Sequence, residues 1–156
     1  MSTRANVILS ETFSYKAGNG KQVTKTKKLF FYRHSDGYPE VALTSLKKLI
    51  DWMKAGKIRR ELSQGAGWLI VIGAMEYNSI PAFKVELTGK TESGLIESFE
   101  DPKSWKVGSW EPTTEIHGDI EFLYELDMRT AELVIKRRIF AESEKLDTWE
   151  IIKEDE

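Results

Sequence analysis

Alternating hydrophobic and polar residues in the first quarter of the chain predict a β-hairpin. Residues 6–14 favour a strand, and the Ala-Gly-Asn-Gly segment at 17–20 supplies residues suited to a tight turn. The return strand is expected over about 23–34. Its alternation separates two faces, with Leu29, Phe31 and Arg33 on one side and Phe30, Tyr32 and His34 on the other.

Two helices are expected after this hairpin. Apolar residues recur at helical spacing over about 40–55, and Gly56 is suited to the position just after a helix end. A second apolar stretch covers about 59–77. Its length favours a helix, whereas its β-branched run at 70–72 also fits a buried strand. We expect the helix.

The remaining part of the chain regains β character. Short strands are expected at 85–87 and 95–99, and longer ones at 120–127 and 133–140, with an edge strand near 149–152. Strands are thus followed by helices and then by strands. This order predicts an α+β fold, an antiparallel sheet of the N-terminal hairpin and the C-terminal strands, with two helices packed on one face.

Length and composition limit the classes of protein that fit. The 156 residues suit a single domain over 1–156, with an acidic C-terminal tail from about 141. The absence of cysteine excludes thiolate metal sites, a cysteine nucleophile and disulfides, and it fits a reducing compartment. No apolar run approaches the ~20 residues of a membrane helix, and the start lacks a signal-peptide core. We therefore expect a cytoplasmic protein without membrane association.

The net charge of −2 conceals a strong asymmetry along the chain. Residues 1–60 hold 13 Lys and Arg against 4 Asp and Glu, whereas residues 61–156 hold 10 against 21. Such asymmetry fits a basic nucleic-acid face, head-to-tail association of copies, or an acidic tail covering basic surface. It equally fits two solvated faces of opposite sign.

Candidate chemistry gathers in two segments that lie far apart in the sequence. His34 precedes Ser-Asp-Gly at a strand end, and His117 precedes Gly-Asp at a strand start. If these strands are neighbours, both imidazoles meet Asp36 and Asp119, which suits a shared binding site, a metal site or an oriented general base. The same residues also suit turns stabilised by local hydrogen bonds.

Arg33 and Tyr38 flank the first of these turns, and Arg4 lies just ahead of the first strand. An arginine beside an exposed ring suits a carboxylate, a phosphate or a base, although a stacked pair that stiffens a loop fits equally well. We predict no catalytic residue, no metal ligand and no cofactor. The glycines near 65 match neither a dinucleotide fingerprint nor a phosphate loop, and the sequence holds no Ser/His/Asp nucleophile signature or paired-carboxylate motif. The predicted ligand-binding residues, called the rim, are Arg4, Arg33, His34, Asp36, Tyr38, His117 and Asp119.

Four segments carry a resemblance to a known group of proteins. The start Met-Ser-Thr-Arg-Ala-Asn-Val, residues 31–40, the Ala-Gly-Trp-Leu at 66–69 and residues 117–124 together resemble a family of small hypothetical proteins of bacterial genomes, prophages and phages. The resemblance covers roughly residues 1–127. It implies a host-interaction or counter-defence role, and it transfers no activity or site residue.

The leading hypothesis is a non-enzymatic binding module whose rim holds a host protein or a small anionic ligand. The first alternative is a nucleic-acid binder, with Phe30 and Tyr32 stacking on bases, although the pI of 5.8 is low for that class. The second alternative is a small metal-dependent hydrolase, and the aromatic content also fits a homo-oligomer. The basic groups suited to phosphates are Lys25, Lys27, Lys28, Lys57, Arg59, Arg60, Lys136, Arg137 and Arg138.

Overall fold

The computed structural model of the chain describes residues 3–77, 107–139 and 148–152. These residues form two helices and one mixed sheet of six strands, which confirms the α+β class. The strands expected at 85–87 and 95–99 lie outside the described residues. The elements are β1 (Ala5–Lys16), β2 (Gln22–Arg33), α1 (Pro39–Lys54), α2 (Leu62–Tyr77), β3 (Glu111–Thr113), β4 (Phe122–Asp127), β5 (Leu133–Ile139) and β6 (Thr148–Ile152).

The sheet is mixed, where the sequence predicted an antiparallel one. Its strand order is β3-β2-β1-β4-β5-β6, and β1 runs antiparallel to β2 but parallel to β4. A parallel neighbour needs a long crossover connection, and β4 follows only after both helices. The expected edge strand near 149–152 is confirmed as β6, which pairs with β5 alone.

The predicted hairpin and its turn are confirmed. The 12 residues of β1 pair in register with those of β2, from Ala5 opposite Arg33 to Lys16 opposite Gln22. At the turn, the Ala17 N–H donates to the Lys21 carbonyl at 2.9 Å, and Gly20 adopts a φ of +79° that few other residues tolerate.

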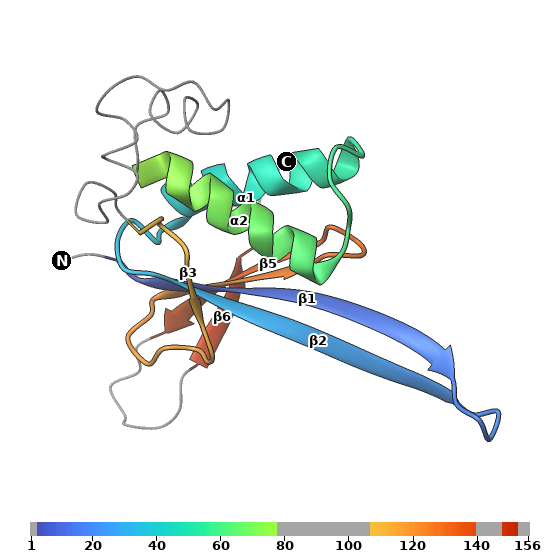
Figure 1. The fold of residues 1–156 in the computed structure, drawn as a ribbon. Coiled ribbons are helices and arrows are strands. Elements are labelled where there is room, and N and C mark those ends of the chain that lie inside the picture. The colour runs from blue at the N-terminus through green and yellow to red at the C-terminus, as the bar shows by residue number, and fades with distance from the viewer. Residues whose placement is uncertain (1–2, 78–106, 140–147, 153–156) are drawn as a thin grey trace.

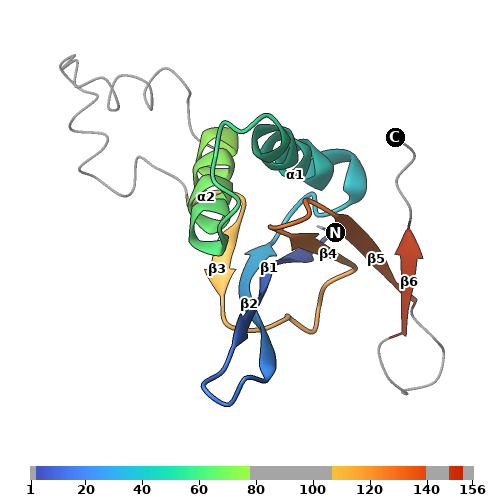
Figure 2. The same cartoon turned by 90° about the vertical axis from the view of Figure 1, so that its right-hand side faces the viewer.

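One large hydrophobic cluster joins both helices to the sheet. It combines the apolar stripe of α1 with Leu69 of α2 and with Val7 and Leu9 of β1. Figures 1 and 2 show both helices on the same side of the sheet. Gly73 allows a close approach, because a Cβ there would lie 3.0 Å from the Trp110 backbone nitrogen. None of the described helices is long and apolar enough to cross a membrane.

A smaller hydrophobic cluster is formed mainly by strand residues that do not belong to the large one. Ile8, Tyr32, Ile120 and Leu123 are buried together, with Phe30 and Trp149 packed against them. The predicted alternation of β2 is therefore confirmed, since Phe31 belongs to the large cluster. The strand expected over 120–127 begins only at Phe122, and Ile120, which precedes it, belongs to this smaller cluster.

The turn between β2 and α1 is a packed structural element. The Gly37 N–H donates to the Thr3 carbonyl at 2.9 Å, and the Gly37 carbonyl accepts from the Tyr124 hydroxyl at 2.7 Å. A Cβ on Gly37 would lie 2.7 Å from the Cβ of Ala5, so this close contact excludes any larger residue. Asp36 occupies the left-handed region at a φ of 56°. The Asp-Gly pair is thus explained by chain packing.

Candidate functional site

Tyr32 is the centre of the predicted rim, and both histidines contact its ring. The His117 ring stacks on it with centroids 3.8 Å apart and an interplanar angle of 14°, and the His34 ring meets it edge-on at 4.5 Å. The Tyr32 hydroxyl donates to both carboxylate oxygens of Asp119, at 3.0 and 3.2 Å. The two distant His-containing segments therefore meet at one buried tyrosine, which sequence reasoning had not included in the rim.

Each polar member of this group has a partner within the fold. Nε2 of His117 lies 3.0 Å from the Thr113 hydroxyl, and the His117 backbone N–H donates to the Asn6 side chain at 2.8 Å. The Asp119 carboxylate also pairs with Arg4 at 3.4 Å. Nε2 of His34 lies 3.1 Å from a carboxylate oxygen of Glu111. The group joins the ends of β1 and β2 to the connection that follows β3.

The polar side chains around Tyr32 are paired with one another or with neighbouring residues of the fold. Burial, with the hydrogen bond to Asp119, raises the pKa of Tyr32 to about 12. Tyr32 is therefore a protonated donor at neutral pH, well away from the pKa near 7 that suits acid–base catalysis. Across the described ranges, no three His, Asp or Glu side chains are placed to hold a metal ion.

The other three rim residues lie apart from this group. Arg33 points to the helix side of the sheet, where its fully buried guanidinium donates to Glu76 at 2.6 and 2.9 Å. The same guanidinium lies 5.2 Å from the ring centroid of Trp110. Asp36 is exposed in its turn, and the half-buried Tyr38 is the N-cap residue of α1. The structure thus brings together four of the seven predicted residues, namely Arg4, His34, His117 and Asp119.

Replacing His117 with alanine is expected to lower the free energy of unfolding by about 1–2 kcal/mol. The change removes a ring stack and a hydrogen bond, each worth about 0.5–1.5 kcal/mol. His34→Ala is the matched control, since that side chain is 61% exposed and should cost much less. Urea unfolding of both variants measures the difference. Equal stabilities of His117→Ala and the wild type would contradict the structural role.

The outer part of the β1–β2 hairpin extends beyond the neighbouring strands β3 and β4. β4 pairs with β1 only as far as Ser10, and β3 pairs with β2 only over 30–32. Residues 11–28 therefore form a two-stranded ribbon, and no strand of the described residues lies beside either of its edges. Figure 1 shows this ribbon projecting beyond the rest of the sheet. We call residues 11–28 the arm.

The arm is strongly basic. It carries five lysines and one glutamate, a net charge of +4. All five ammonium groups belong to exposed residues, and within the described parts of the chain none of them forms an ion pair. The lysines are Lys16, Lys21, Lys25, Lys27 and Lys28.

One face of the arm, which we call the aromatic face, combines rings with lysines. Phe13 and Tyr15 stack with centroids 6.3 Å apart. Nζ of Lys27 lies 5.3 Å from the Phe13 centroid, and Nζ of Lys25 lies 5.7 Å from that of Tyr15. The two lysine ammonium groups on this face thus lie over aromatic rings.

The opposite face, which we call the hydroxyl face, carries paired alcohols. Thr12 and Thr26 lie 3.0 Å apart across the strands, and Ser14 and Thr24 lie 3.1 Å apart. Strand alternation places Lys16 and Lys28 on this face as well. Both faces of the arm therefore present positive charge.

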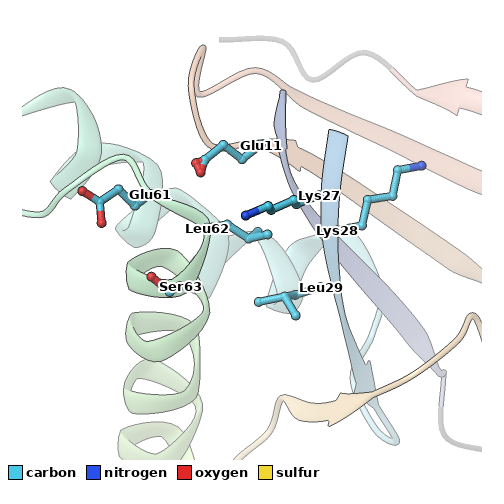
Figure 3. Close-up of a pocket in the computed structure, with 7 residues that line it drawn as sticks. All are labelled: Glu11, Lys27, Lys28, Leu29, Glu61, Leu62 and Ser63. Carbon is cyan, nitrogen blue, oxygen red and sulfur yellow. The ribbon is translucent and has the colours of Figure 1, made fainter. Parts of the chain in front are cut away.

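A pocket of about 640 Å³ lies where the arm meets the start of α2. Figure 3 shows Lys27 directed into this pocket between Glu11 and Glu61, while Lys28 points away from it. The two carboxylates lower the positive potential around Lys27. The remaining four lysines of the arm are thus its main phosphate-binding candidates.

The residues predicted to stack on bases are not available. Tyr32 is 3% exposed and its ring contacts both histidines, while Phe30 packs in the smaller cluster. They lie in the buried half of β2, whereas Phe13 and Tyr15 belong to the outer half of the hairpin. The signal in the sequence is the run Thr-Lys-Thr-Lys-Lys at 24–28, which is polar on both faces and is typical of a strand without a buried face.

The predicted basic groups also differ in their surroundings. Lys136 pairs with Glu125, and Arg137 pairs with Glu150. Arg138 is buried and donates to the Gly118 carbonyl at 2.6 Å. The side chains of Lys136, Arg137 and Arg138 are thus all engaged within the fold, which leaves the arm and the exposed Lys57 and Arg59 as basic surface.

Comparisons with protein-family models, with curated proteins and with solved structures find no match for this chain.

Proposed function

We propose that this chain is a non-enzymatic nucleic-acid-binding module whose arm contacts the phosphate backbone. The observation that carries the proposal is a projecting two-stranded ribbon with five exposed lysines that form no ion pair among the described residues. Phosphate contacts by lysine supply most of the affinity of a protein for nucleic acid of any sequence. The overall pI of 5.8 does not oppose this, since the acidic residues are concentrated after residue 60.

The arm supports this proposal better than the rim supports an anion site. In the rim, Arg4 already pairs with Asp119, and His34 lies beside Glu111. A bound anion would have to displace or approach those carboxylates, which costs free energy. Binding of a host protein or an anionic ligand at the rim stays a prediction, as do the phage-type kinship, a cytoplasmic location and self-association.

The salt dependence of binding tests the proposal. Fluorescence anisotropy with labelled DNA and RNA, single-stranded and duplex, should show binding at low salt. Four to five phosphate contacts predict a loss of affinity of about 10²-fold between 50 and 200 mM salt. Absence of binding at low salt, or binding that ignores salt, would remove the proposal.

A further inference from the structure

We infer that the arm inserts edge-on into the major groove of duplex DNA, an inference that rests on the proposed nucleic-acid binding. The first support is the distribution of charge over both faces. Lys25 and Lys27 lie on the aromatic face, and Lys16 and Lys28 lie on the hydroxyl face. A flat contact uses the cations of one face only. A ribbon between two phosphate backbones uses those of both.

The dimensions of the arm fit this groove. A ribbon with its side chains is about 10 Å thick, the spacing between packed sheets. The major groove of B-form DNA is about 12 Å wide, whereas the minor groove is about 6 Å wide. Six residues from Glu11 to Lys16 extend about 20 Å, so the arm is long enough to lie along the groove between the two backbones while the body of the protein stays outside. The deep and narrow major groove of A-form RNA does not admit it.

Groove insertion also requires open edges, and among the described residues no strand pairs with either edge of the arm. Neither β3 nor β4 extends beside residues 11–28, so the leading edge of the ribbon can approach the base pairs. The hydroxyl pairs Thr12–Thr26 and Ser14–Thr24 lie on the hydroxyl face with one member on each strand, so whichever strand leads carries hydroxyl donors and acceptors. Serine and threonine hydroxyls contact any base, so this arrangement suits binding with little sequence preference.

The aromatic face disfavours a single strand as the ligand. Binding of a single strand relies on exposed rings on which successive bases stack. Here the Phe13 and Tyr15 rings stack on each other, and each has a lysine ammonium over it. Tyr15 is 42% exposed, but a base that stacked on either ring would have to compete with the lysine ammonium that already lies over it.

Three labelled probes of the same sequence test the inference with the intact chain: duplex DNA, its single strand, and duplex DNA with bulky C5 substituents on its pyrimidines, which fill the major groove. We expect duplex DNA to bind at least tenfold more tightly than either of the others. Equal binding to the substituted duplex, or preference for the single strand, would overturn groove insertion while leaving nucleic-acid binding intact. Absence of binding to every probe would refute the proposed function itself.

Two paired variants test the use of both faces. Lys25→Gln with Lys27→Gln neutralises the aromatic face, and Lys16→Gln with Lys28→Gln neutralises the hydroxyl face. Each pair should weaken duplex binding. The hydroxyl-face pair should reduce the slope of log affinity against log salt by about two, one for each phosphate contact, and the aromatic-face pair by about one, because Lys27 lies between Glu11 and Glu61 and Lys25 is the phosphate-binding candidate of that face. An effect confined to one pair would indicate a flat contact and overturn edge-on insertion.

Discussion

Replacing Glu76 with alanine is expected to lower the free energy of unfolding by about 3–5 kcal/mol, the usual cost of removing one partner of a buried ion pair. The Arg33 side chain is 0% exposed, and Glu76 accepts two hydrogen bonds from it. The truncation leaves a guanidinium buried without its counter-charge. Urea unfolding followed by tryptophan fluorescence measures the loss.

Two further variants make this prediction specific. Glu115→Ala removes an exposed carboxylate and should leave stability within about 0.5 kcal/mol of the wild type. Arg33→Met combined with Glu76→Gln should recover part of the loss, because no unpaired charge is then left inside the protein. If Glu76→Ala proved as stable as Glu115→Ala, the pair would contribute nothing to the fold.

The same ion pair gives the protein a defined pH dependence. Burial alone raises the pKa of Glu76, but the Arg33 hydrogen bonds and charge outweigh it and lower that pKa below its ordinary value of 4.5. A carboxyl group with a lowered folded-state pKa stabilises the protein fully above its unfolded-state pKa. That stabilisation is lost as the pH falls through the folded-state value. The stability difference between wild type and Glu76→Ala should therefore be constant near neutral pH and shrink below about 4.5.

The second large effect is expected for the arm. Changing Lys16, Lys21, Lys25 and Lys28 to glutamine should weaken nucleic-acid binding by at least about 10²-fold at physiological salt, since four phosphate contacts are removed. The melting temperature should change little, because all four side chains are exposed. Anisotropy titrations and thermal unfolding supply the two measurements.

A control of equal charge separates this effect from the loss of net charge. Four exposed cations of α1 and the segment after it can be changed to glutamine in the same way: Lys48, Lys54, Lys57 and Arg59. This control should keep most of the affinity of the wild type. If both quadruple variants lost affinity equally, the interaction would be a diffuse response to net charge and the arm would have no special role.

Local signals in the sequence predicted most of the described helices and strands, whereas β3 and the order of the strands in the sheet were not predicted. Apolar spacing and Gly56 predicted α1, and the Ala-Gly-Asn-Gly segment predicted the hairpin turn. The length argument chose correctly between helix and strand for α2. The parallel pairing of β1 with β4 had no local signal, since it depends on how a long connection crosses the sheet.

For the rim residues, too, the sequence predicted the face of the strand but not the partner of each side chain. Strand alternation correctly placed Arg33 and His34 on opposite faces, yet it does not identify what each side chain meets. Glu76 is the partner of Arg33, and it lies on a helix 43 residues further along the chain. Tyr32 was assigned to base stacking, although burial at the inner end of β2 makes it the support of His34 and His117.

Mapping the bound nucleic acid onto the protein tests the central claim most directly. In ¹H–¹⁵N spectra recorded during titration with duplex DNA, the amide signals of residues 11–28 should shift progressively, and those around His34, His117 and Asp119 should stay in place. Shifts gathered at the rim, or spectra unchanged at low salt, would contradict binding by the arm.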